Sequence, residues 1–183
     1  MAKEKKVDGH IDISYTSELE LLEFEDRVLS QIPSEKVPYR KNQIPWYNEH
    51  NNILINIVKD PPEDITAVAV KAAEKLFPRG RFGWTIDLVN PGQTVLEHID
   101  PLPDTRKLAP EEKKFIRYVL FLRDRKPGQY IEVNNEPIID WSMGDYLKLR
   151  AEDLIDLDHD WHMATNGGLH PLYVMTISGP VNG

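Results

Sequence analysis

From Arg81 onward the chain alternates between short apolar stretches and turn residues, and this pattern limits the folds that it can adopt. Asn90-Pro-Gly92, Lys126-Pro-Gly128 and Asn134-Asn135 are typical turn sequences. The stretches between the turns predict strands at residues 82–89, 93–97, 115–122, 130–133, 144–150, 162–165 and 172–178. Roughly seven or eight short strands with regular turn signals are typical of a sandwich, a barrel or a jelly roll. We therefore expect a mainly β fold with flanking helices.

The sequence before this region predicts two amphipathic helices. Ser17 and Glu20 resemble a capping box, and apolar residues recur after them at helical spacing, so a helix is expected from about residue 17 to residue 31. Asp60-Pro-Pro-Glu63 combines an N-cap residue, a proline at the first helical position and an early carboxylate, and predicts a second helix that ends at Pro78. Both helices are expected to brace one outer face of a sheet.

Length and composition favour a single domain. The chain has 183 residues, of which 40% are hydrophobic, and this allows one substantial core. We expect residues 1–80 to support a β core formed by residues 81–183, with a further strand at residues 51–59. The proline-containing segments 33–50 and 101–114 are expected to be loops that flank the mouth of that core. The second segment is also too polar to be expected inside it.

The composition excludes several classes of function. The chain contains no cysteine, which rules out disulfides, thiolate zinc sites, iron–sulfur clusters and a cysteine nucleophile. Any metal must therefore be held by histidine, aspartate or glutamate. The net charge of −8 disfavours nucleic acid as a partner. Neither the charged start, Met1 to Lys6, nor any later window resembles a signal peptide or a membrane span, so we expect a soluble cytoplasmic protein without a membrane partner.

His98 and Asp100 stand at the end of one expected strand, two residues apart. Because strand side chains repeat their direction every two residues, the imidazole and the carboxylate should face one point. A catalytic metal needs a third ligand, and His162 is the best donor, since a jelly roll can fold a late strand beside an early one. Two histidines and a carboxylate are the ligand set of non-haem Fe(II) oxygenases.

Residues 82–179 resemble the 2-oxoglutarate/Fe(II)-dependent oxygenase superfamily, whose fold is a double-stranded β-helix, a cupin-like jelly roll. The resemblance lies in the order and spacing of His98-Ile-Asp100, Tyr118-Val-Leu-Phe-Leu122, Lys126-Pro-Gly-Gln129, Trp141-Ser-Met-Gly-Asp145, His162-Met-Ala-Thr-Asn166 and Pro171-Leu-Tyr-Val-Met-Thr-Ile-Ser-Gly179. It implies that His98, Asp100 and His162 bind Fe(II), with 2-oxoglutarate and O2 as cosubstrates. The prolyl and aspartyl hydroxylase branches are the most similar, which implies hydroxylation of an amino-acid side chain, free or in a polypeptide.

One position departs from the pattern of this superfamily. Its members usually carry an arginine or lysine about ten residues after the second histidine, where it pairs with the far carboxylate of 2-oxoglutarate, and Leu172 stands there in this chain. Some branches take the cation from the strand after the His-x-Asp motif, so Arg117 is the expected substitute and Arg150 the second choice. Tyr118 and Asn166 are further candidates for the cosubstrate pocket.

Other interpretations of the same residues stay open. His159 lies three residues from His162 and is a rival third ligand, although its acidic surroundings are more typical of a solvated loop. Arg117 is about as well explained by a surface ion pair. A cupin-type metalloprotein that does not use 2-oxoglutarate is an alternative, which Leu172 favours. The other alternative is a non-catalytic β-sandwich binding domain in which the histidines are incidental.

Overall fold

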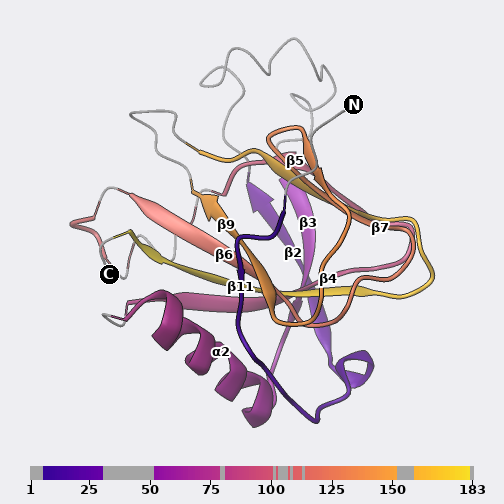
Figure 1. Cartoon of the computed structure of the whole chain (residues 1–183), viewed down its shortest axis with the longest axis horizontal. Coiled ribbons are helices and arrows are strands. Elements are labelled where there is room, and N and C mark those ends of the chain that lie inside the picture. The colour runs from indigo at the N-terminus through magenta and orange to yellow at the C-terminus, as the bar shows by residue number, and fades with distance from the viewer. Residues whose placement is uncertain are drawn as a thin grey trace.

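Two antiparallel sheets form the centre of the molecule in the computed structural model of the chain (Figure 1). The structure describes residues 6–30, 52–78, 81–100, 102, 107, 109–112, 114–151 and 159–181. The larger sheet contains, in spatial order, β1 (Gly9–His10), β9 (Asp145–Arg150), β6 (Phe115–Phe121), β11 (Leu172–Pro180), β4 (Gly83–Val89), β3 (Asn52–Val58) and β2 (Phe24–Ser30). The smaller sheet contains β5 (Thr94–His98), β10 (His162–Asn166), β7 (Gln129–Val133) and β8 (Glu136–Ile138).

The strands from β4 to β11 pair in a nested order. β7 and β8 form the central hairpin, and β6 with β9, β5 with β10 and β4 with β11 pair outward from it. Successive pairs belong alternately to the smaller and the larger sheet, so one long antiparallel ribbon is wound into a helix. This connectivity is the double-stranded β-helix, or jelly roll, that the sequence predicts.

The strands expected after residue 81 are confirmed within a few residues, because their turns carry strong local signals. Asn134 and Asn135 have positive φ angles of 53° and 65° and join β7 to β8 as a tight hairpin. The strand expected at residues 51–59 is confirmed as β3. The sequence did not predict β1 or β8, which contain only two and three residues.

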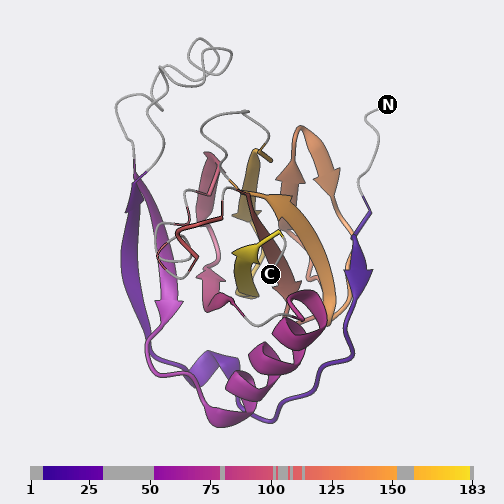
Figure 2. The same ribbon diagram turned by 90° about the vertical axis from the view of Figure 1, so that its left-hand side faces the viewer.

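One of the two expected helices is present among the described residues. α2 (Glu63–Leu76) packs against the outer face of the larger sheet, where Ile65, Val68 and Ala72 lie in one buried cluster with strand residues (Figure 2). The N-cap is Pro62 and not the expected Asp60. In the part of the chain that the structure describes, no helix is both long and apolar enough to cross a membrane.

The helix predicted at residues 17–31 is wrong. A single 3-10 turn, η1 (Leu19–Leu21), is followed by β2, which pairs with β3 along its whole length. Ser17 does not cap a helix of its own, because its backbone N–H and its hydroxyl donate to the carboxylate of Asp64 at 2.8 and 2.6 Å. Ser17 therefore does not cap a helix at its own position and instead binds the N-terminal segment to the first turn of α2.

The two segments expected to be loops have different outcomes. Residues 33–50 lie outside the described part of the chain. The expectation that residues 101–114 avoid the core is wrong for at least two positions, since Leu102 and Ala109 are buried in a small cluster with Phe115 and Ala151. Isolated apolar residues in a polar segment can thus be buried against neighbouring strands.

Replacement of Asp64 by asparagine should lower the midpoint of thermal unfolding at pH 7. Hydrogen bonds from the Ser17 hydroxyl and from the backbone of Thr16 and Ser17 hold the pKa of Asp64 well below its usual range. The stabilisation is present above the unfolded-state pKa and is lost as the pH falls through the folded-state pKa. The difference in unfolding midpoint between wild type and Asp64→Asn should therefore become smaller as the pH falls. The control variant Asp60→Asn should keep the wild-type midpoint. Equal midpoints for Asp64→Asn and wild type at pH 7 would contradict this role.

Candidate metal centre

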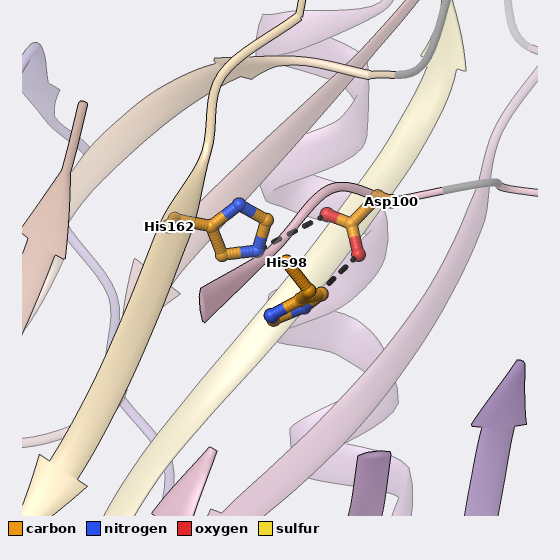
Figure 3. Close-up of side chains that lie close together, drawn as sticks. All are labelled: His98, Asp100 and His162. Atoms are coloured by element: carbon orange, nitrogen blue, oxygen red, sulfur yellow. Dashed lines mark ion pairs between the residues drawn. The ribbon is translucent and has the colours of Figure 1, made fainter. Parts of the chain in front are cut away.

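Three predicted metal ligands converge where β5 and β10 lie side by side (Figure 3). The pairing of these strands sets His98 opposite His162, with ring centroids 4.2 Å apart. Asp100 lies between the rings: its Oδ1 is 3.6 Å from Nε2 of His98 and its Oδ2 is 3.4 Å from Nε2 of His162. One possible ligand atom from each residue lies within 4.8 Å of the others. The structure therefore brings together the residues that the sequence singled out.

A β-bulge aims His98 into the barrel. The register between β10 and β5 shifts, so that His162 opposes His98 whereas Ala164 opposes Val95. One more residue lies between the partners on β5 than between those on β10, which lets Val95 and His98 face the same interior despite an odd spacing. The carbonyl of Leu96, inside the bulge, accepts a hydrogen bond from Nδ1 of His98 at 2.7 Å.

Both imidazoles are fixed in the tautomer that suits a metal ligand. Nδ1 of His162 donates to the carbonyl of Asp160 at 3.1 Å, as Nδ1 of His98 does to its own carbonyl partner. A carbonyl can only accept, so each Nδ1 carries the hydrogen and the neutral ring has its lone pair on Nε2. Burial, followed by the neighbouring His98, lowers the pKa of His162 to about 4, so this ring is neutral at pH 7.

Asp100 supplies a charged oxygen without a hydrogen-bond partner. Its side chain is 2% exposed, and Oδ1 accepts a 2.7 Å hydrogen bond from Nη1 of Arg117. Burial opposes the ionised form, but attraction to the positive charge of Arg117 outweighs it and holds the pKa of Asp100 well below its usual range. Its other oxygen, Oδ2, is buried and has no hydrogen-bond partner. A buried carboxylate with one oxygen beside each imidazole Nε2, and with Oδ2 lacking a hydrogen-bond partner, fits a divalent cation.

A cavity of about 70 Å³ adjoins His98 and His162 and lies between the two sheets. Its walls are mostly aliphatic, with a polar group formed by Asp87, Arg117 and Thr176 on the larger sheet. Thr85 donates to Asp87 at 3.1 Å and its hydroxyl also lies 2.6 Å from that of Thr176. Burial raises the pKa of Asp87 to about 6, in spite of the nearby positive charge of Arg117. The interior next to the metal ligands is therefore small, largely apolar and locally acidic.

Asp87 is a candidate functional residue that the sequence analysis missed. It lies on β4 and is 8% exposed. In the sequence, Asp87 is the one carboxylate of Trp84-Thr-Ile-Asp-Leu-Val89. It lies two residues from Thr85 and two residues from Val89, so the three share one face of the strand. This spacing places Asp87 on the face that packs between the sheets.

The expected cosubstrate residues are only partly near the ligands. Arg117 lines the cavity, but two of its groups are engaged: Nη1 with Asp100 and Nε with the Ser178 hydroxyl at 3.1 Å. Leu172 also lines the cavity, so an apolar side chain faces the interior where the resembling superfamily usually has arginine or lysine. Tyr118 is on the opposite face of β6, where its ring contacts Phe77 at 5.3 Å between centroids. The alternation of side chains along the strand separates Tyr118 from Arg117.

The remaining candidates are outside the cavity. Arg150 pairs with Asp160 at 2.8 Å. The side-chain amide of Asn166 donates at 2.9 Å to the carbonyls of Val89 and His170, so it stabilises the turn after β10. The rival ligand His159 does not belong to the cluster, and its ring lies 5.9 Å from that of Trp161.

No protein-family model matches the chain, and no curated protein matches it in sequence. A similar solved structure is a sugar phosphate isomerase from a cupin superfamily of Silicibacter pomeroyi, with 12% identity and a TM-score of 0.41 over 91% of this chain and 76% of that one. A protein described as a predicted oxalate decarboxylase from Thermotoga maritima has 13% identity and a TM-score of 0.36, covering 71% and 82%. A cupin family protein with a double-stranded β-helix fold from Methanocaldococcus jannaschii has 8% identity and a TM-score of 0.34, covering 54% and 70%. At these scores the likeness says nothing about activity, and the fold assignment rests on the strand pairing.

Replacement of Asp87 by asparagine should stabilise the metal-free protein above pH 6. Because burial raises the folded-state pKa to about 6, wild-type stability falls as the pH rises from about 4 through 6. The free energy of unfolding of Asp87→Asn should exceed that of wild type by at most roughly 3 kcal/mol at pH 8, with little difference below pH 4. Denaturant titrations at several pH values measure this, with the exposed Asp140→Asn as the control. A destabilised Asp87→Asn protein at pH 8 would contradict the assignment.

Proposed function

We propose that this chain is an Fe(II)-dependent oxygenase that uses a 2-oxo acid as cosubstrate and hydroxylates an amino-acid side chain, free or in a polypeptide. The single observation that supports it is the convergence of two Nε2 lone pairs and the unpartnered Oδ2 of Asp100. A ligand set of this kind leaves positions of an iron open for other molecules. 2-Oxoglutarate is the cosubstrate that the family resemblance implies.

Each residue has a distinct role in this proposal. His98, Asp100 and His162 would hold the metal, and Arg117 orients the Asp100 carboxylate through Oδ1, with Oδ2 beside His162. The aliphatic cavity excludes water from the space beside them. When bound, Fe(II) with a 2-oxo acid and O2 supplies the oxidising chemistry that inserts oxygen into a C–H bond.

A second candidate is a cupin-type metalloprotein that does not use 2-oxoglutarate. The observation in its favour is Leu172, which replaces the expected cation and lines an aliphatic part of the cavity. A non-catalytic β-sandwich domain is less well supported, because it gives no reason to bury a carboxylate oxygen without a hydrogen-bond partner.

Anaerobic titration of the purified protein with Fe(II) and then 2-oxoglutarate tests the proposal. We expect one Fe(II) per chain and a weak visible charge-transfer band when the 2-oxo acid chelates it. His98→Ala and Asp100→Ala should lose stoichiometric iron binding and the band, since each removes a ligand. His170→Ala, which changes an exposed histidine outside the cluster, is the matched control and should behave as wild type.

Two results would count against the proposal. Iron binding that persists in both ligand variants would exclude the centre itself. Stoichiometric iron binding without any change on addition of 2-oxo acids would favour the second candidate.

A further inference from the structure

We propose, building on the proposed function, that the 2-oxo acid bound here has an uncharged apolar tail, and that the cavity selects against the second carboxylate of 2-oxoglutarate. The cavity is continuous from His98 and His162 to Leu172, so a chelating ligand would extend its tail into it. Three features of this cavity favour an uncharged tail, namely its aliphatic walls, the position of its cation and a negative side chain on one wall.

The walls are aliphatic on both sheets. They are formed by Val89, Val95, Val119, Ile131, Val133, Leu147, Leu149, Leu172 and Val174, all of them buried. An apolar tail gains free energy by leaving water for such a space, whereas a carboxylate loses its hydration there.

The positive charge is at the wrong end for a second carboxylate. Among the described lining residues, Arg117 is the one with a permanent positive charge, and it donates to Asp100 and to Ser178. Ser178 and Leu172 are six residues apart on β11, or about 20 Å along a strand. Arg117 therefore lies at the metal end of the cavity with Nη1 and Nε already engaged, and a second carboxylate farther from the metal would be buried without a cation of its own.

A negative group on the same wall opposes a second carboxylate as well. Asp87 lines the cavity, opposite Val174 in the register of β4 and β11. Its pKa of about 6 makes it predominantly ionised at neutral pH. A dicarboxylate would thus meet repulsion in addition to the loss of hydration, whereas an uncharged tail would meet neither.

Calorimetric titration of the anaerobic Mn(II)-loaded protein with two matched ligands tests this selection. The ligands are 2-oxoglutarate and 5-methyl-2-oxohexanoate, in which an isopropyl group replaces the far carboxylate at nearly the same size. Wild type should bind 5-methyl-2-oxohexanoate at least about tenfold more tightly. Leu172→Arg should reverse the preference by supplying the missing cation, and Leu172→Met, of similar volume, should keep it.

Asp87→Asn provides a second, nearly isosteric variant that does not depend on placing a charge in the core. Asp87→Asn should reduce the difference in affinity between the two ligands, because it removes a negative charge that repels the dicarboxylate. Equal or tighter binding of 2-oxoglutarate by wild type would overturn the selection while leaving a 2-oxo-acid oxygenase intact. Failure of both ligands to bind the Mn(II)-loaded protein would overturn the selection together with the proposed function.

Discussion

The hydrogen bonds from the two imidazole Nδ1 atoms to backbone carbonyls are the constraint on which the candidate centre depends. The carbonyls belong to Leu96, in the bulge of β5, and to Asp160, just before β10. They fix the rotation and the tautomer of each ring, so that the lone pairs of Nε2 face Asp100 before any metal arrives. Each carbonyl lies two residues before its own histidine, and the pairing of β5 with β10 then sets the two rings side by side.

The charges around this constraint explain how an anionic residue can be buried there. Arg117 neutralises one oxygen of Asp100, and it comes from β6 in the opposite sheet. The second oxygen has no hydrogen-bond partner, which leaves a buried carboxylate oxygen that a divalent cation would coordinate. Asp87 adds a further acidic group on the same interior surface. In the proposed complex, the same charged groups would act on both the metal and the ligand tail.

Local sequence signals predicted the strands, and the clustering of His98 with Asp100, better than they predicted the tertiary environment. These signals depend only on residues a few positions apart, as for the turn at Asn134 and the two-residue spacing of His98 and Asp100. The prediction of a helix at residues 17–31 was wrong because the four-residue spacing of Phe24 and Val28 is compatible with one face of a helix and with one face of a strand. Pairing with β3 stabilises the strand. The bulge in β5 and the pairing of Arg117 with Asp100 require contacts between distant segments, which the sequence pattern does not contain.

X-ray absorption at the iron edge of protein reconstituted anaerobically with Fe(II) measures the central claim most directly. The predicted spectrum contains scattering from two imidazole rings with oxygen ligands completing the sphere, and one imidazole contribution disappears in His162→Ala. A spectrum without imidazole scattering, or one that His162→Ala leaves unchanged, would contradict a metal centre formed by residues 98, 100 and 162.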